Sequence, residues 1–203
     1  MNALNNGFTP PQHQRPLTAD ERARFESEWH PDADGIPHRA AARVVIFDSQ
    51  GRLYLLEGHD FDDATHRWWF TIGGGVGANE DLREGAAREL REETGLEAEP
   101  ERFVGPVLYR EATFHFNSHD RRQDEHFFVL HITDEERELI DSGENRRLTV
   151  AEQQVLDAAR WFSLGELDAF QKAGQTVYPQ GLVALARSWW DGWDGQLVHS
   201  IEP

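Results

Sequence analysis

The chain has 203 residues, 38% hydrophobic and 28% charged, a composition typical of one soluble globular domain long enough to bury a core. The absence of cysteine excludes disulfide bonds, thiolate catalysis and cysteine-ligated zinc. The formal net charge of −17 opposes binding to duplex nucleic acid. The alternative interpretation of this acidity is that it serves only solubility. We find no apolar run of roughly 20 residues and no signal-peptide pattern, so we expect a cytoplasmic protein without a membrane-spanning segment.

The first 37 residues are rich in proline and carry little apolar pattern. Within them, Thr18 and Glu21 have the spacing of a capping box, which predicts a short helix through about Trp29. We therefore expect residues 1–37 to form an arm packed on a domain that spans residues 38–203.

The core begins at Ala40 with a buried strand that runs to residue 47. A turn at 48–51 leads to a predicted hairpin partner at 52–56, and a polar loop covers 58–67. Further along the chain, the patterns predict strands at 68–72, 103–116, 125–132 and 160–162, and helices at 81–94 and 180–190. Strands with interspersed helices indicate an α/β or α+β sandwich.

Three carboxylates lie on one side of the predicted helix at 81–94. Glu89, Glu92 and Glu93 are three and four positions apart, and they border an apolar arc that includes Leu90. Like charges at the edge of a buried face repel one another and lose hydration, which a divalent cation would relieve. An all-oxygen cluster suits Mg²⁺, with Mn²⁺ as a substitute. The alternative is a solvated charged helix without a metal.

Glycines precede and follow this helix. Gly73, Gly74 and Gly75 permit unusual backbone conformations at a strand-to-helix crossing and allow the main chain to approach a ligand closely. Gly95 stands where a helix C-cap glycine is expected.

The segment GGVGANEDLREGAARELREETGL, from Gly74 to Leu96, resembles the Nudix box at every specified position. The resemblance implies an α/β (α+β) Nudix fold, with a mixed β-sheet sandwiched between helices. It also implies that Glu92 and Glu93 are metal ligands and that Glu89 is a ligand or the base that activates water. The remaining roles follow by position: Arg88 orients carboxylates, Glu80 braces the loop and helix, and Gly74 and Gly75 approach the substrate.

Members of the family often recruit a further carboxylate from outside the box. Glu152 is the first candidate here and Glu125 the second, with an exposed structural role as the alternative for each. Arg43 and Arg110 are candidate phosphate contacts, with salt bridges as the alternative. Aromatic side chains that could stack on a base are Trp68, Trp69, Phe114 and Phe116, of which Trp69 could equally belong to the core. Zinc at His115 and His119 is disfavoured, because that region is predicted to be strand and loop.

These features predict a Mg²⁺-dependent hydrolase that cleaves a pyrophosphate bond in a nucleoside diphosphate derivative: a nucleotide, a nucleotide sugar or a dinucleotide. A homodimer is a possible assembly. The alternatives are a non-catalytic nucleotide sensor on the same fold, against which the complete set of carboxylates argues, and a protein-interaction module. An isoprenoid diphosphate isomerase is discarded, because that chemistry relies on a cysteine in the family.

Overall fold

The computed structural model describes residues 17–116 and 119–202. Residues 1–16 of the predicted arm lie outside this range. The helices are α1 Ala19–Ser27, α2 Leu82–Thr94, α3 Asp134–Ser142, α4 Glu152–Val155, α5 Leu164–Lys172 and α6 Leu182–Trp190, with a 3₁₀ turn η1 at Pro100–Arg102. The strands are β1 His30–Pro31, β2 Pro37–Phe47, β3 Leu53–Asp60, β4 Asp63–Phe70, β5 Ile72–Gly75, β6 Val104–His115, β7 Asp120–His131, β8 Leu156–Phe162 and β9 Val198–Glu202.

The described strands form one mixed sheet with the order β4-β3-β2-β7-β6-β9. Strands β1 and β5 also pair with β2, and β8 pairs with β3. Neighbours are parallel between β2 and β7 and between β6 and β9, and antiparallel elsewhere. The predicted hairpin of β2 with β3 is reduced to the pair Phe47 and Leu53, because β2 pairs mainly with β5 and β7.

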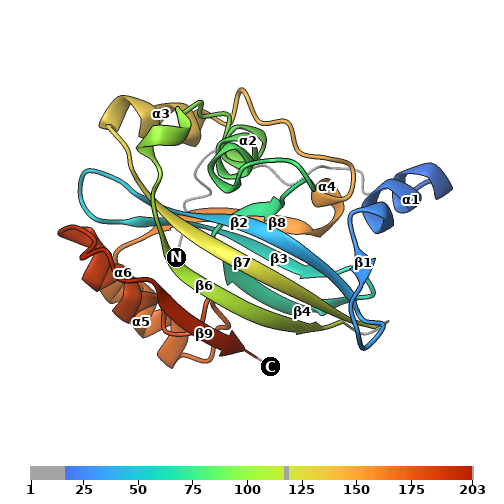
Figure 1. The fold of residues 1–203 in the computed structure, drawn as a ribbon. Coiled ribbons are helices and arrows are strands. Elements are labelled where there is room, and N and C mark those ends of the chain that lie inside the picture. The colour runs from blue at the N-terminus through green and yellow to red at the C-terminus, as the bar shows by residue number, and fades with distance from the viewer. Residues whose placement is uncertain (1–16, 117–118, 203) are drawn as a thin grey trace.

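The sheet lies between two layers of helices. Helices α2 and α3 cover one face, and α5 and α6 cover the other (Figure 1). Alternation along β2 supplies both cores: Val44 and Ile46 pack on the α2 side, whereas Val45 and Phe47 pack on the side of α5 and α6. The predicted mixed sheet between helices is therefore confirmed.

Helix α2 has clear signals at both ends. Asp81 is its N-cap and forms a capping box with Glu84, while Gly95 ends the helix in the left-handed conformation at φ 79°. Ala86 and Leu90 are completely buried and anchor the helix on the sheet. The predicted helix, its C-cap glycine and its apolar arc are confirmed.

Other predictions need correction. The polar loop expected at 58–67 is the end of β3 and most of β4, which side by side form a hairpin. Residues 64–67 of β4 are exposed and show no apolar pattern, so only its last three residues, which belong to the predicted strand at 68–72, carried a strand signal. Helices α3 and α5 and strand β9 were not predicted. The capping box of α1 is confirmed, with Thr18 as N-cap. Within the described ranges, we find no helix with the length and apolar character that crossing a membrane requires.

Candidate metal and catalytic site

Three glutamates converge where α2 faces α4. Glu89 and Glu93 of α2 and Glu152 at the start of α4 each offer a carboxylate oxygen, and these atoms lie within 4.8 Å of one another. Glu89 is 5% exposed and Glu93 is 4% exposed. Glu89 and Glu93 belong to the Nudix-box segment, and Glu152 is the first of the two carboxylates that the sequence analysis named as candidates from outside it. Glu92 lies outside this group, with its side chain 26% exposed.

Burial dominates the electrostatics of the cluster. It raises the pKa of Glu89 to about 7 and also raises the pKa values of Glu93 and Glu152, with repulsion among the carboxylates adding to the effect. Backbone N–H groups hold two of them: Gly73 N donates to Glu93 Oε2 and Thr149 N donates to Glu152 Oε2, each at 2.7 Å. Since every donor atom is a carboxylate oxygen, the residues fit a hard divalent cation such as Mg²⁺ or Mn²⁺.

Arg88 connects the helix with the loop before it. Its Nη1 donates to Glu89 Oε1 at 2.6 Å, its Nη2 to the backbone oxygen of Gly75 at 2.7 Å, and its Nε to Glu80 Oε1 at 2.7 Å. Arg88 Nη1 also lies 3.4 Å from Glu92 Oε2. Hydrogen bonds from Arg88 lower the pKa of Glu80. These contacts support an orienting role for Arg88 and a bracing role for Glu80.

The three glycines are needed for different reasons. Gly73 has φ 130°, and a Cβ there would stand 2.1 Å from a backbone oxygen of β2. A Cβ at Gly74 would stand 2.8 Å from both carboxylate oxygens of Glu89. A Cβ at Gly75 would stand 2.8 Å from the Nη1 atom of Arg39. The first glycine therefore supports the backbone path, and the other two leave room for charged side chains of the site.

A buried ionic network lies behind the glycine loop. Arg43 donates from Nη1 to the backbone oxygen of Gly73 at 2.6 Å and from Nε to Glu125 Oε1 at 2.9 Å. Glu125 accepts a second bond from Arg110, which also donates to Glu202 Oε2 at 2.7 Å. Burial raises the pKa of Glu125, but the two arginines outweigh it and the net shift is downward. Arg43 and Arg110 thus form salt bridges, and Glu125 is outside the carboxylate cluster.

A cavity of about 1050 Å³ opens beside the cluster. Trp68, Phe114 and Phe116 line it, as expected for candidate base platforms. Trp69 does not line it: this residue is 7% exposed and meets the Phe162 ring edge-on at a centroid distance of 5.1 Å. We therefore withdraw Trp69 as a substrate contact, because its side chain points into the opposite core.

The two histidines considered for zinc lie at the hairpin between β6 and β7. His115 ends β6, and its Nδ1 lies 2.9 Å from Asp120 Oδ1. His119 lies in the turn and lines the cavity. Among the described side chains, these two histidines belong to no group of three or more potential metal ligands.

A comparison with family models matches residues 37–181 to the NUDIX domain. The chain belongs to the Nudix family. Curated Nudix relatives include the RNA pyrophosphohydrolase of Novosphingobium aromaticivorans, 40% identical over 65 residues that cover 32% of this chain and 39% of that protein. The RNA pyrophosphohydrolase of Sphingopyxis alaskensis is 27% identical over 164 residues, 75% of this chain and 94% of that protein. Solved structures with some likeness include a MutT protein from Methanosarcina mazei Go1, with TM-score 0.49, 19% identity and coverage of 77% of this chain and 95% of that chain.

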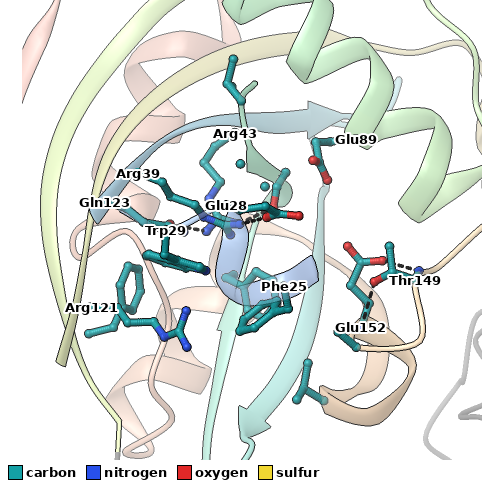
Figure 2. Close-up of a pocket in the computed structure, with 18 of the residues that line it drawn as sticks. Phe25, Glu28, Trp29, Arg39, Arg43, Glu89, Arg121, Gln123, Thr149 and Glu152 are labelled. Carbon is teal, nitrogen blue, oxygen red and sulfur yellow. Dashed lines mark hydrogen bonds and ion pairs between the residues drawn. The ribbon is translucent and has the colours of Figure 1, made fainter. Parts of the chain in front are cut away.

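The segment before the matched Nudix domain also reaches the site. Helix α1 lies near the cavity, and Figure 2 shows Phe25, Glu28 and Trp29 beside Arg39 and Arg121. The guanidinium carbons of Arg39 and Arg121 lie 4.3 Å and 4.6 Å from the centroid of the Trp29 ring, and Arg39 forms an ion pair with Glu28. Sequence reasoning missed these residues, because no motif spacing relates the arm to the box.

Proposed function

We propose that this Nudix protein is a Mg²⁺-dependent hydrolase that cleaves a diphosphate linkage in a nucleoside 5′-polyphosphate or a derivative of one. One observation carries the proposal: Glu89, Glu93 and Glu152 converge within 4.8 Å at the wall of a large cavity. A purely structural cluster of this kind would be costly, because Glu89 and Glu93 are buried and Glu152 is half-buried. Burial and mutual repulsion raise all three pKa values despite the hydrogen bond from Arg88 to Glu89.

The proposal gives separate tasks to the residues. A Mg²⁺ ion held by Glu89, Glu93 and Glu152 would lower the pKa of a bound water and offset charge on phosphate oxygens. The Gly73 N–H fixes one oxygen of Glu93, and Arg88 fixes one oxygen of Glu89. Burial raises the pKa of Glu89 to about 7, and its carboxylate lies in the cluster, so its proposed role is metal ligand or base.

The volume and lining of the cavity, together with the named relatives, indicate which substrates to test first. Its volume of about 1050 Å³ lies at the upper end of the range for small-molecule sites and accommodates a nucleotide. Trp68, Phe114 and Phe116 supply aromatic surface for a base. Relatives named RNA pyrophosphohydrolase make a triphosphorylated 5′ end of RNA the first candidate. The net charge of −17 opposes binding along a duplex, whereas a phosphate chain at one end needs only the local cations of the cavity.

A substrate panel tests this proposal. The protein is incubated with Mg²⁺ and a short 5′-triphosphorylated RNA, nucleoside triphosphates, ADP-ribose, nucleotide sugars and dinucleoside polyphosphates, and the products are identified by chromatography. We expect cleavage within the phosphate chain of one class and loss of most activity in Glu93→Gln and Glu152→Gln. If no compound is cleaved while a nucleotide binds equally well to wild type and variants, the protein is a sensor instead.

A further inference from the structure

The guanidinium of Arg39 lies beside the glycine loop, in the cavity that also holds the carboxylate cluster. An ideal Cβ at Gly75 would stand 2.8 Å from Arg39 Nη1, and the backbone oxygen of Gly75 accepts a hydrogen bond from Arg88. The negative charge of Glu89 also acts on Arg39 and favours the charged form of its guanidinium. A diphosphate held at the cluster would therefore have a cation on the side of the glycine loop.

Arg39 differs from the buried arginines in the group that neutralises it. Arg43 and Arg110 are paired with Glu125, whose side chain is 0% exposed, and separating that network would leave buried charges unpaired. Arg39 is paired with Glu28, whose side chain is 56% exposed at the end of α1. Because the Glu28 carboxylate is exposed, it can move into solvent without leaving a buried charge of its own, so an incoming anion can take its place beside Arg39.

The guanidinium of Arg39 also has more donors than its surroundings have acceptors. Its side chain is 14% exposed, its Nε has no hydrogen-bond partner, and its carboxylate contact with Glu28 uses Nη1. One face is covered by the Trp29 ring at 4.3 Å, which accepts no conventional hydrogen bond. Burial lowers the pKa of Arg39, and Glu28 provides the largest opposing charge. A phosphate group, with several acceptor oxygens, suits this guanidinium better than a single carboxylate does.

We propose that Arg39 is a phosphate-binding residue of the substrate pocket and that Glu28 occupies its place until the substrate displaces it. The inference rests on the proposed function, because it requires an anionic substrate in this cavity. Glu28 precedes the segment 37–181 that matches the Nudix domain, so the arm supplies this substitute for a phosphate. The arm thereby sets the affinity for the substrate without taking part in the chemistry.

A binding experiment tests this directly. The probe is a guanosine 5′-triphosphate analogue with a methylene bridge between the α and β phosphorus atoms, titrated calorimetrically into folded protein with Mg²⁺. Glu28→Gln removes the competing charge and is expected to lower Kd by about two- to fivefold. Arg39→Gln is expected to raise Kd by about tenfold or more. In the Arg39→Gln background, Glu28→Gln should have no further effect.

The matched control is Glu26→Gln. Glu26 forms a comparable ion pair from the same helix, with Oε1 2.7 Å from Arg121 Nη2, so its loss loosens α1 similarly. Equal tightening in Glu26→Gln and Glu28→Gln would overturn the proposal, as would an unchanged or higher Kd in Glu28→Gln or no binding by wild type. Hydrolysis of the parent triphosphate is measured separately. Failure there, with the expected order of Kd values intact, counts against the proposed hydrolysis alone.

Discussion

Removing one carboxylate from the cluster should stabilise the metal-free protein. Glu89 is 5% exposed, and its pKa rises from the ordinary value of 4.5 to about 7 in the fold. Because the folded state favours the protonated form of Glu89, ionisation of Glu89 lowers the free energy of unfolding. This loss is absent below pH 4.5 and is complete once the pH has risen through about 7. The variant Glu89→Gln has no charge to bury, so it should keep that stability at pH 8.

The pKa shift sets the size of this effect. Each pKa unit corresponds to 1.36 kcal/mol, so a rise from 4.5 to about 7 amounts to about 3 kcal/mol at pH 8. In a chain of this size, a gain of that magnitude raises Tm by about 6 to 12 °C. A weaker hydrogen bond from Arg88, which now donates to Glu89 at 2.6 Å, will reduce the gain.

Urea unfolding in a chelator at pH 5 and pH 8 measures the difference. The free energy of unfolding of wild type should be lower at pH 8 than at pH 5, and the decrease should be smaller in Glu89→Gln. Added Mg²⁺ should stabilise wild type more than the variant. Glu138→Gln, at an exposed position on α3, is the control and should follow wild type. A Glu89→Gln variant that is less stable than wild type at pH 8 would refute the conclusion that burial and repulsion of the Glu89 charge destabilise the metal-free protein.

Two further substitutions separate the chemistry of the site from its support. Gly74→Ala should fold but lose at least about tenfold in kcat, because its Cβ would press on Glu89 oxygens at 2.8 Å; circular dichroism and initial rates distinguish the two properties. Arg110→Met should lower the free energy of unfolding by about 3 to 5 kcal/mol in a urea titration, because Glu125 and Glu202 lose a buried partner. Near-wild-type stability in Arg110→Met would mean that the network is not held by its charges.

Local sequence spacing predicted the helix of the site well. The positions of Glu89 and Glu93 on one side of the helix and the C-cap at Gly95 depend on contacts within a few residues. Glu152 was a candidate only by resemblance, because its approach to α2 depends on how the chain returns after α3. No local pattern fixes the relation of such distant segments.

Tertiary contacts explain what sequence reasoning missed. The pairing of Arg39 with Glu28 requires α1 to fold back against β2, and neither residue belongs to a recognisable motif. Strand β9 is short and largely exposed, so its burial pattern gives little signal, yet Glu202 is 5% exposed against Arg110. Trp69 was a candidate for stacking on a base, with the core as the alternative, and strand alternation turns it to the opposite face of the sheet, into the core.

The most direct test of the central claim is Mg²⁺-dependent hydrolysis by wild type and Glu93→Gln, with Glu138→Gln as the control. Glu93 is 4% exposed, and its Oε2 accepts from Gly73 N at 2.7 Å, so glutamine can keep that contact while removing the charge. We expect the Glu93→Gln protein to remain folded, to lose at least about 100-fold in kcat and to respond weakly to Mg²⁺, while Glu138→Gln matches wild type. Equal activity in all three proteins, or activity undiminished by a chelator, would contradict the assignment of the carboxylate cluster as the catalytic metal site.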